Sequence, residues 1–116
     1  MSRLVLPALA ALLSVSLAGP IRAASYDCAD AKAPDEKAVC ADREMDDQDV
    51  EMAVLYTRLK QLLPTGQRGD IETAQTTWLK RRTACEADRA CLSKAYADRL
   101  FQLRAAFDAL AARGPF

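Results

Sequence analysis

The chain has 116 residues, with 16 basic and 16 acidic side chains, four cysteines and no histidine. The missing histidine removes the commonest general base and the commonest metal ligand, which argues against most catalytic and metal-dependent functions. The balanced charge gives little support for binding to nucleic acid, because such domains usually carry a marked basic excess.

The N-terminus has the pattern of a signal peptide. A basic start is followed by an almost wholly apolar run from residue 4 to 18, shorter than the roughly 20 residues that a membrane span needs. We expect cleavage after Ala23, with Ala18 and Ala24 as alternatives, so residues 1–23 form the signal peptide. An uncleaved anchor is disfavoured by length. A lipid-bearing cysteine would follow the cleavage site directly, whereas Cys28 stands several residues further on. We therefore predict a periplasmic or secreted protein that is not stably inserted in a membrane after cleavage.

Residues 24–116 are expected to form one small domain with an uneven charge distribution. Removing the leader takes away Arg3 and Arg22 and no acid, which leaves 14 basic against 16 acidic residues. Residues 27–51 hold ten acids against three basic residues, and the remainder is net basic, densest at residues 80–82. Such charges usually solvate helix surfaces, and overall charge informs association more than specific function.

The first half of the domain predicts two helices. Residues 24–33 are small and polar, without periodicity, and read as an extended segment. Pro34 suits the first position of a helix and Asp35 its first turn, which predicts a short helix over residues 34–41. Asp42 can cap a second helix over residues 43–63. Its apolar stripe recurs at helical spacing and comprises Met45, Met52, Leu55, Tyr56, Leu59, Leu62 and Leu63.

Two further helices are expected in the second half. Pro64, Gly66 and Gly69 predict a break, after which Asp70 can cap a helix over residues 71–84. Its expected inward side chains are Ile71, Ala74, Gln75, Trp78 and Leu79. The last helix spans residues 90–112, with Leu92, Ala95, Tyr96, Leu100, Leu103, Phe107 and Leu110 facing inward. No segment alternates like a strand. The fold class is therefore all-α, a small antiparallel bundle of one short and three longer helices.

The four cysteines of an exported chain predict two disulfides that staple this bundle. Three pairings are possible. We favour Cys28 with Cys40 and Cys85 with Cys91, because each bond then closes a short loop around a helix terminus; the crossed pairings remain open. Antiparallel helices would bring the cysteines to one end of the bundle.

The sequence gives little support for a zinc site, for catalytic carboxylates or for nucleic-acid binding. Zinc is disfavoured because neither cysteine spacing is C-x-x-C and no histidine is present. Carboxylate pairs such as Asp46 with Asp47, or Asp42 with Asp49, are more often solvated than catalytic. The basic cluster at residues 80–82 is too short to indicate nucleic-acid binding. We predict no catalytic residue, no metal site and no cofactor, and hence a binding protein rather than an enzyme.

Five polar or aromatic side chains on the helical stripes are expected to be structural. Tyr56, Trp78 and Tyr96 should pack in the core with a hydrogen-bonded polar tip. Gln75 and Arg82 lie three and four residues from Trp78 and are expected to bridge helices by hydrogen bonds.

Several of these residues recur in a known pattern. The opening is Ser25-Tyr26-Asp27-Cys28, then Ala33-Pro34-x-Glu36-Lys37-x-x-Cys40. The middle is Asp42, Met45, Asp49, Met52 and Tyr56. The end is Gln75-x-x-Trp78-Leu79-x-x-Arg82, Cys85, Cys91-Leu92 and Tyr96-x-x-Arg99-Leu100. The chain thus resembles the lysozyme inhibitor LprI-like N-terminal family over nearly all of its mature length. It departs at Ala33, where a threonine usually caps the first helix, at Gln48, a usually apolar position, and at Thr83, where an acid is frequent.

The resemblance implies a secreted or envelope-associated bacterial helical domain whose activity is inhibition of lysozyme. Our first hypothesis is that the chain acts by occluding the cleft of lysozyme and not by catalysis. C-type lysozymes are strongly basic, so an acidic surface would steer encounter with them. The candidate partner-binding residues are Asp42, Glu44, Asp46, Asp47 and Glu51. The alternative is a periplasmic structural or stress-related accessory protein that binds another envelope partner. Binding to lysozyme should weaken as salt rises, whereas an apolar contact should not.

Overall fold

The computed structural model describes residues 25–114, so the predicted signal peptide and its cleavage position lie outside the described residues. Four α-helices follow a single 3-10 turn at Cys28–Asp30: α1 (Pro34–Ala41), α2 (Arg43–Leu62), α3 (Thr65–Ala84) and α4 (Arg89–Ala111). No strand occurs among these residues. The all-α prediction of one short and three longer helices is confirmed.

The helix starts follow from local hydrogen bonding. Asp42 accepts a hydrogen bond from the Met45 amide at 3.1 Å and caps α2, and Asp88 accepts one from the Cys91 amide at 2.9 Å and caps α4. At α1 the cap position is Ala33, whose side chain has no acceptor. Glu36 partly compensates, because its carboxylate accepts from the Ala33 amide at 3.2 Å.

The predicted start of α3 is wrong. We expected Gly66 and Gly69 to interrupt the chain and Asp70 to cap a helix from residue 71, but α3 begins at Thr65, with Pro64 at the cap position. Pro64 ends α2 and has a φ of −59°, which already suits a helix. Glycine permits a break without forcing one, and both glycines keep helical backbone inside α3.

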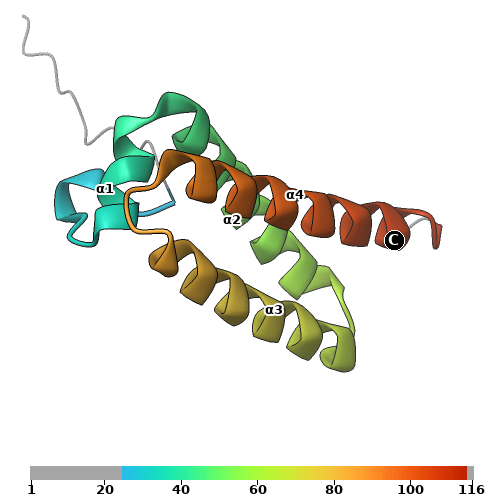
Figure 1. Cartoon of the computed structure of the whole chain (residues 1–116). Helices are drawn as coiled ribbons and strands as arrows, with labels where there is room; N and C mark the ends of the chain where they lie inside the picture. Colours follow the sequence, from blue (N-terminus) through green and yellow to red (C-terminus); the bar gives the residue numbers. More distant parts are fainter. Residues whose placement is uncertain (1–24, 115–116) are drawn as a thin grey trace, which may run out of the picture.

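Consecutive long helices run antiparallel around a common core, so α3 runs opposite to both α2 and α4 (Figure 1). Contacts between α2 and α4 are the most extensive, and α1 contacts all three long helices. The buried core residues are Val39, Met45, Met52, Leu59, Leu63, Trp78, Cys85, Leu92, Ala95, Tyr96, Leu100, Leu103 and Leu110. Three predicted inward positions are wrong: Leu62, Leu79 and Phe107 remain 46%, 40% and 37% exposed. Leu62 and Leu79 lie toward the edge of the buried stripe of their helices, since a bundle this small covers only a narrow arc of each helix. Phe107 is in phase with the buried Leu103 and Leu110 but lies near the C-terminal end of α4.

Both disulfides join the favoured partners. Cys28 bonds to Cys40 with Cα atoms 5.8 Å apart, and Cys85 bonds to Cys91 with Cα atoms 5.5 Å apart. Figure 1 shows α1 and the α3–α4 connection at the same end of the bundle, opposite the α2–α3 connection. The bridges therefore staple the end at which α1 packs against the long helices. Among residues 25–114 no helix is both long and apolar enough to cross a membrane.

Candidate functional site

The five acidic residues proposed as a partner contact lie on or next to the first half of α2, but they differ in exposure. Glu44 and Asp47 are exposed, Asp42 and Glu51 are half-buried, and Asp46 is only 8% exposed. The helical periodicity explains the difference in exposure, because five side chains spread over residues 42–51 of a helix point in different directions and cannot all face solvent. Only part of the acidic segment is therefore available to a partner.

Two of the half-buried acids are engaged within the molecule. The Met45 backbone amide, and then the Arg89 guanidinium at 2.6 Å, hold the pKa of Asp42 below its usual value. Glu51 receives two hydrogen bonds of 2.7 Å from Arg104 of α4. These pairs tie the start and the middle of α2 to α4. They also reduce the net negative charge that the segment presents to solvent.

Asp46 sits in a different environment. One of its carboxylate oxygens is buried without a hydrogen-bond partner among the described residues. Burial, followed by the nearby charges of Asp47 and Asp49, raises its pKa above the usual value. The ionised Asp46 carboxylate therefore destabilises the folded state, and its side chain exposes little surface to a partner.

A polar network occupies the interior beneath α1. Arg82 of α3 donates to Asp35 of α1 at 2.9 Å and lies 3.6 Å from an oxygen of Asp49 of α2. The Tyr96 hydroxyl of α4 donates to Asp49 at 2.7 Å. Asp35 and Asp49 are at most 1% exposed. One side chain from each of the four helices thus meets here, and one guanidinium faces two buried carboxylates.

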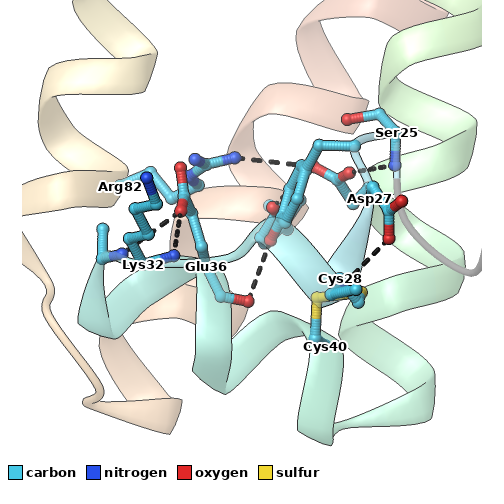
Figure 2. The surroundings of a disulfide bond; sticks show 12 residues. Ser25, Asp27, Cys28, Lys32, Glu36, Cys40 and Arg82 are labelled. Atoms are coloured by element: carbon cyan, nitrogen blue, oxygen red, sulfur yellow. Dashed lines mark hydrogen bonds and ion pairs between the residues drawn. A yellow bond between two sulfur atoms is a disulfide. The ribbon is translucent and has the colours of Figure 1, made fainter.

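The N-terminal segment closes this network. Figure 2 shows the Cys28–Cys40 bridge between that segment and α1. The Ser25 amide donates to the second Asp49 oxygen at 2.8 Å. The Tyr26 hydroxyl donates to the Glu36 carbonyl at 3.0 Å. Burial, and then the charge of Asp49, raises the pKa of Tyr26. The N-terminal segment, predicted only to be extended, therefore donates a hydrogen bond to Asp49 and packs against the buried network.

Aromatic rings enclose the guanidinium of Arg82. Its central carbon lies 5.7 Å from the ring centres of both Tyr26 and Trp78, within the range of cation–π attraction. Trp78 packs edge-on against Tyr96 with ring centres 5.1 Å apart and donates to the Ala95 carbonyl at 2.8 Å. Burial, followed by Asp49, raises the pKa of Tyr96, so its hydroxyl stays protonated and donates.

A second cluster of buried polar side chains lies between α3 and α4, on the side of the first network nearer the α2–α3 connection. Arg99 is 2% exposed and donates to the Gln75 side-chain oxygen at 2.9 Å and to the Ile71 carbonyl at 3.4 Å. Gln75 in turn donates to the Met52 sulfur at 3.1 Å. Burial lowers the pKa of Arg99. Tyr56 is only partly buried and packs against the core edge, with Lys60 5.2 Å from its ring centre.

Sequence reasoning did not assign Asp35, Asp49 and Arg99 to the interior. Asp35 suited the first turn of a helix, and Asp49 was one of ten acids in a short segment, so neither position stood out. The available signal was helical phase: Asp49 stands four residues after Met45, on the same side of α2. The basic cluster divides as well, since Arg82 is buried whereas Arg81 is exposed and pairs with Asp98 at 2.8 Å.

Residues 25–114 contain no cluster of side chains suited to hold a metal ion. The geometry defines the class of protein: a small helical domain, stapled by two disulfides at one end, with a buried charged network that fixes its helices and an open, mixed-charge surface. Among the acidic residues of its α2 segment, Glu44 and Asp47 are exposed.

The chain belongs to the family described as "Lysozyme inhibitor LprI", whose model matches residues 28–113. The match takes in both disulfides and all four helices. Similar proteins include the "Lipoprotein LprI" of Mycobacterium bovis and that of two strains of Mycobacterium tuberculosis, each 33% identical over 111 residues. The alignments cover 93% of this chain and 55% of each relative, so the chain spans about half the length of the curated relatives it matches. No solved structure matches it.

Proposed function

We propose that this chain is an exported, non-catalytic protein that binds lysozyme and inhibits it by occluding the substrate cleft. The observation that carries this proposal is the family match over residues 28–113, which includes every disulfide and helix of the domain. The relatives are named lipoproteins of the same family. Inhibition by occlusion needs a rigid, correctly shaped surface and no reacting group, and the two bridges and the buried network supply such rigidity.

The exposed acids at the start of α2 are proposed as part of the contact. Glu44 and Asp47 point to solvent. C-type lysozymes are strongly basic, and opposite charges speed encounter and favour a docking orientation. Asp42 and Glu51 contribute to the same negative field despite their ion pairs. Because Asp46 is buried, we leave it out of the contact.

The place of action is proposed to be the periplasm or the outside of the cell, where a lysozyme would be met. All four cysteines of the sequence are in disulfides. A lipid attached to Cys28 would require its bridge with Cys40 to be given up. We therefore propose that the mature domain acts without a lipid on these cysteines.

The experiment is hydrolysis of peptidoglycan by a basic C-type lysozyme, with and without excess oxidised protein, at low and physiological salt. Inhibition that weakens as salt rises supports the proposal. No inhibition at either salt concentration rejects it for this lysozyme class, and then binding to another envelope partner becomes the better hypothesis.

A matched pair of charge reversals tests the proposed contact. Asp47→Lys should weaken inhibition, and Asp70→Lys, which makes the same charge change at an exposed position of α3, should weaken it much less. Equal effects of the two variants would show that overall charge matters and that the start of α2 has no special role.

A further inference from the structure

Among residues 25–114, the most exposed large apolar side chain is Phe101 of α4. It is 75% exposed, compared with 54% for Val54 and 46% for Leu62. A single exposed apolar residue needs no explanation. Phe101, however, forms one wall of a groove of about 410 Å³ between α2 and α4. Ala97 and Ala105 lie beside it in the same groove and leave room for an inserted side chain.

The same groove contains an unpaired polar atom. Gln48 of α2 lines it, and its side-chain oxygen is buried without a hydrogen-bond partner among the described residues. A buried acceptor without a donor costs stability. A donor from a bound partner, such as an arginine, a lysine or a backbone amide, would satisfy it.

The edge of the groove is acidic. Asp108 lines it, and Glu44 and Glu51 lie four residues before and three residues after Gln48, on the same side of α2. Arg104 is the basic residue of the groove, and Glu51 already takes both of its hydrogen bonds at 2.7 Å. Glu44 likewise lies 3.5 Å from Arg89, so two of the three acids are partly neutralised within the molecule. A partner therefore meets an aromatic side chain and an open acceptor, beside an edge where acids still outnumber basic residues.

We propose that lysozyme docks on this Phe101 groove, with Phe101 as the apolar anchor and basic lysozyme side chains against Gln48 and the acidic edge. The inference rests on the proposed function and deepens it by locating the contact. A second copy of the chain fits less well, because a symmetric pair formed through this groove would bring the two acidic edges together. A stable interface covers about 800 Å² on each partner, so it extends beyond the groove onto Glu44 and Asp47.

The test is calorimetric binding of a basic C-type lysozyme to the exported, oxidised protein and its variants. Phe101→Ser should weaken binding roughly tenfold or more, because aromatic anchors dominate interface energetics. Ala97→Arg should also weaken binding, because it fills the groove with a long side chain whose positive charge repels a basic lysozyme. The control is Val54→Ser, which removes an exposed apolar side chain from a separate groove lined by Val50 and Thr57, and should leave binding within about twofold. Circular dichroism and thermal unfolding confirm that each variant is folded.

The outcomes separate the two claims. If the wild type binds and inhibits lysozyme but Phe101→Ser and Ala97→Arg bind equally well, the groove is wrong and the proposed function stands. If the wild type does not bind, lysozyme is not the occupant and both fail. A dimer in sedimentation experiments that dissociates on Phe101→Ser would assign the groove to a second copy and overturn the inference.

Discussion

Replacing Arg82 by methionine tests whether the buried network is held together by charge. The Arg82 side chain is 9% exposed and faces Asp35 at 2.9 Å and Asp49 at 3.6 Å, with those two carboxylates at most 1% exposed. Methionine keeps much of the volume and the packing against Trp78 but leaves both carboxylates without a cation. Removing one partner of a buried ion pair costs about 3–5 kcal/mol, a large part of the total stability of a small domain, about 5–15 kcal/mol.

The assay is denaturant unfolding of the oxidised protein at pH 7, followed by far-UV circular dichroism. Arg81→Met is the matched control, because Arg81 is adjacent, 44% exposed and paired with Asp98 at 2.8 Å. An exposed pair of this kind contributes about 0–1 kcal/mol. Adding Asp35→Asn and Asp49→Asn to Arg82→Met should recover part of the loss by removing the unpaired charges. If Arg82→Met loses no more than Arg81→Met, the reasoning is refuted.

Three further predictions concern stability. Ala33→Thr should stabilise the protein by about 1 kcal/mol by supplying the missing cap of α1, measured by denaturant midpoint; no gain would mean that Glu36 already satisfies this helix end. The pKa of Asp46 is higher in the folded protein than in the unfolded chain, so the folded state binds a proton at this carboxylate more tightly. The free energy of unfolding should therefore fall as pH rises above the usual pKa of 3.8. Asp46→Asn should therefore stabilise the protein at pH 7 but not well below pH 3.8, and a pH-independent effect would contradict this. Replacing both cysteines of the 28–40 bridge, which are 12 residues apart, should lower the free energy of unfolding by about 3 kcal/mol. Replacing those of the 85–91 bridge, which are 6 residues apart, should lower it slightly less. Thiol titration of the unreduced wild type should find no free thiol.

The family resemblance and the fold were both accessible from the sequence. The spacing of Met45, Met52, Leu59 and Leu63 placed α2 within one residue, and Asp42 caps its start as predicted. Short loop length favoured the disulfide pairing that the structure has, although the sequence left the crossed pairings open. These features depend on neighbours within a few positions of one another, and short-range geometry is what a sequence displays directly.

The candidate site was only partly predictable. The acidic segment at residues 42–51 was visible as composition, but composition does not say which carboxylate faces water. Asp46 is buried next to its exposed neighbour Asp47, and Asp42 and Glu51 are paired with arginines 47 and 53 residues away. The Phe101 groove was not predicted at all, because it forms only where α4 lies against α2.

The sequence by itself determined the fold class, the number and order of the helices and the family, and it favoured the disulfide pairing that the structure has, because periodicity, caps and cysteine spacing act locally. Only the tertiary structure decided which charges are buried together and which surface is left open. Asp35, Asp49, Arg82 and Tyr96 come from four different helices, and their meeting depends on how those helices pack. The free energy of a charge depends on what surrounds it in space, and that surrounding is fixed only when the bundle closes.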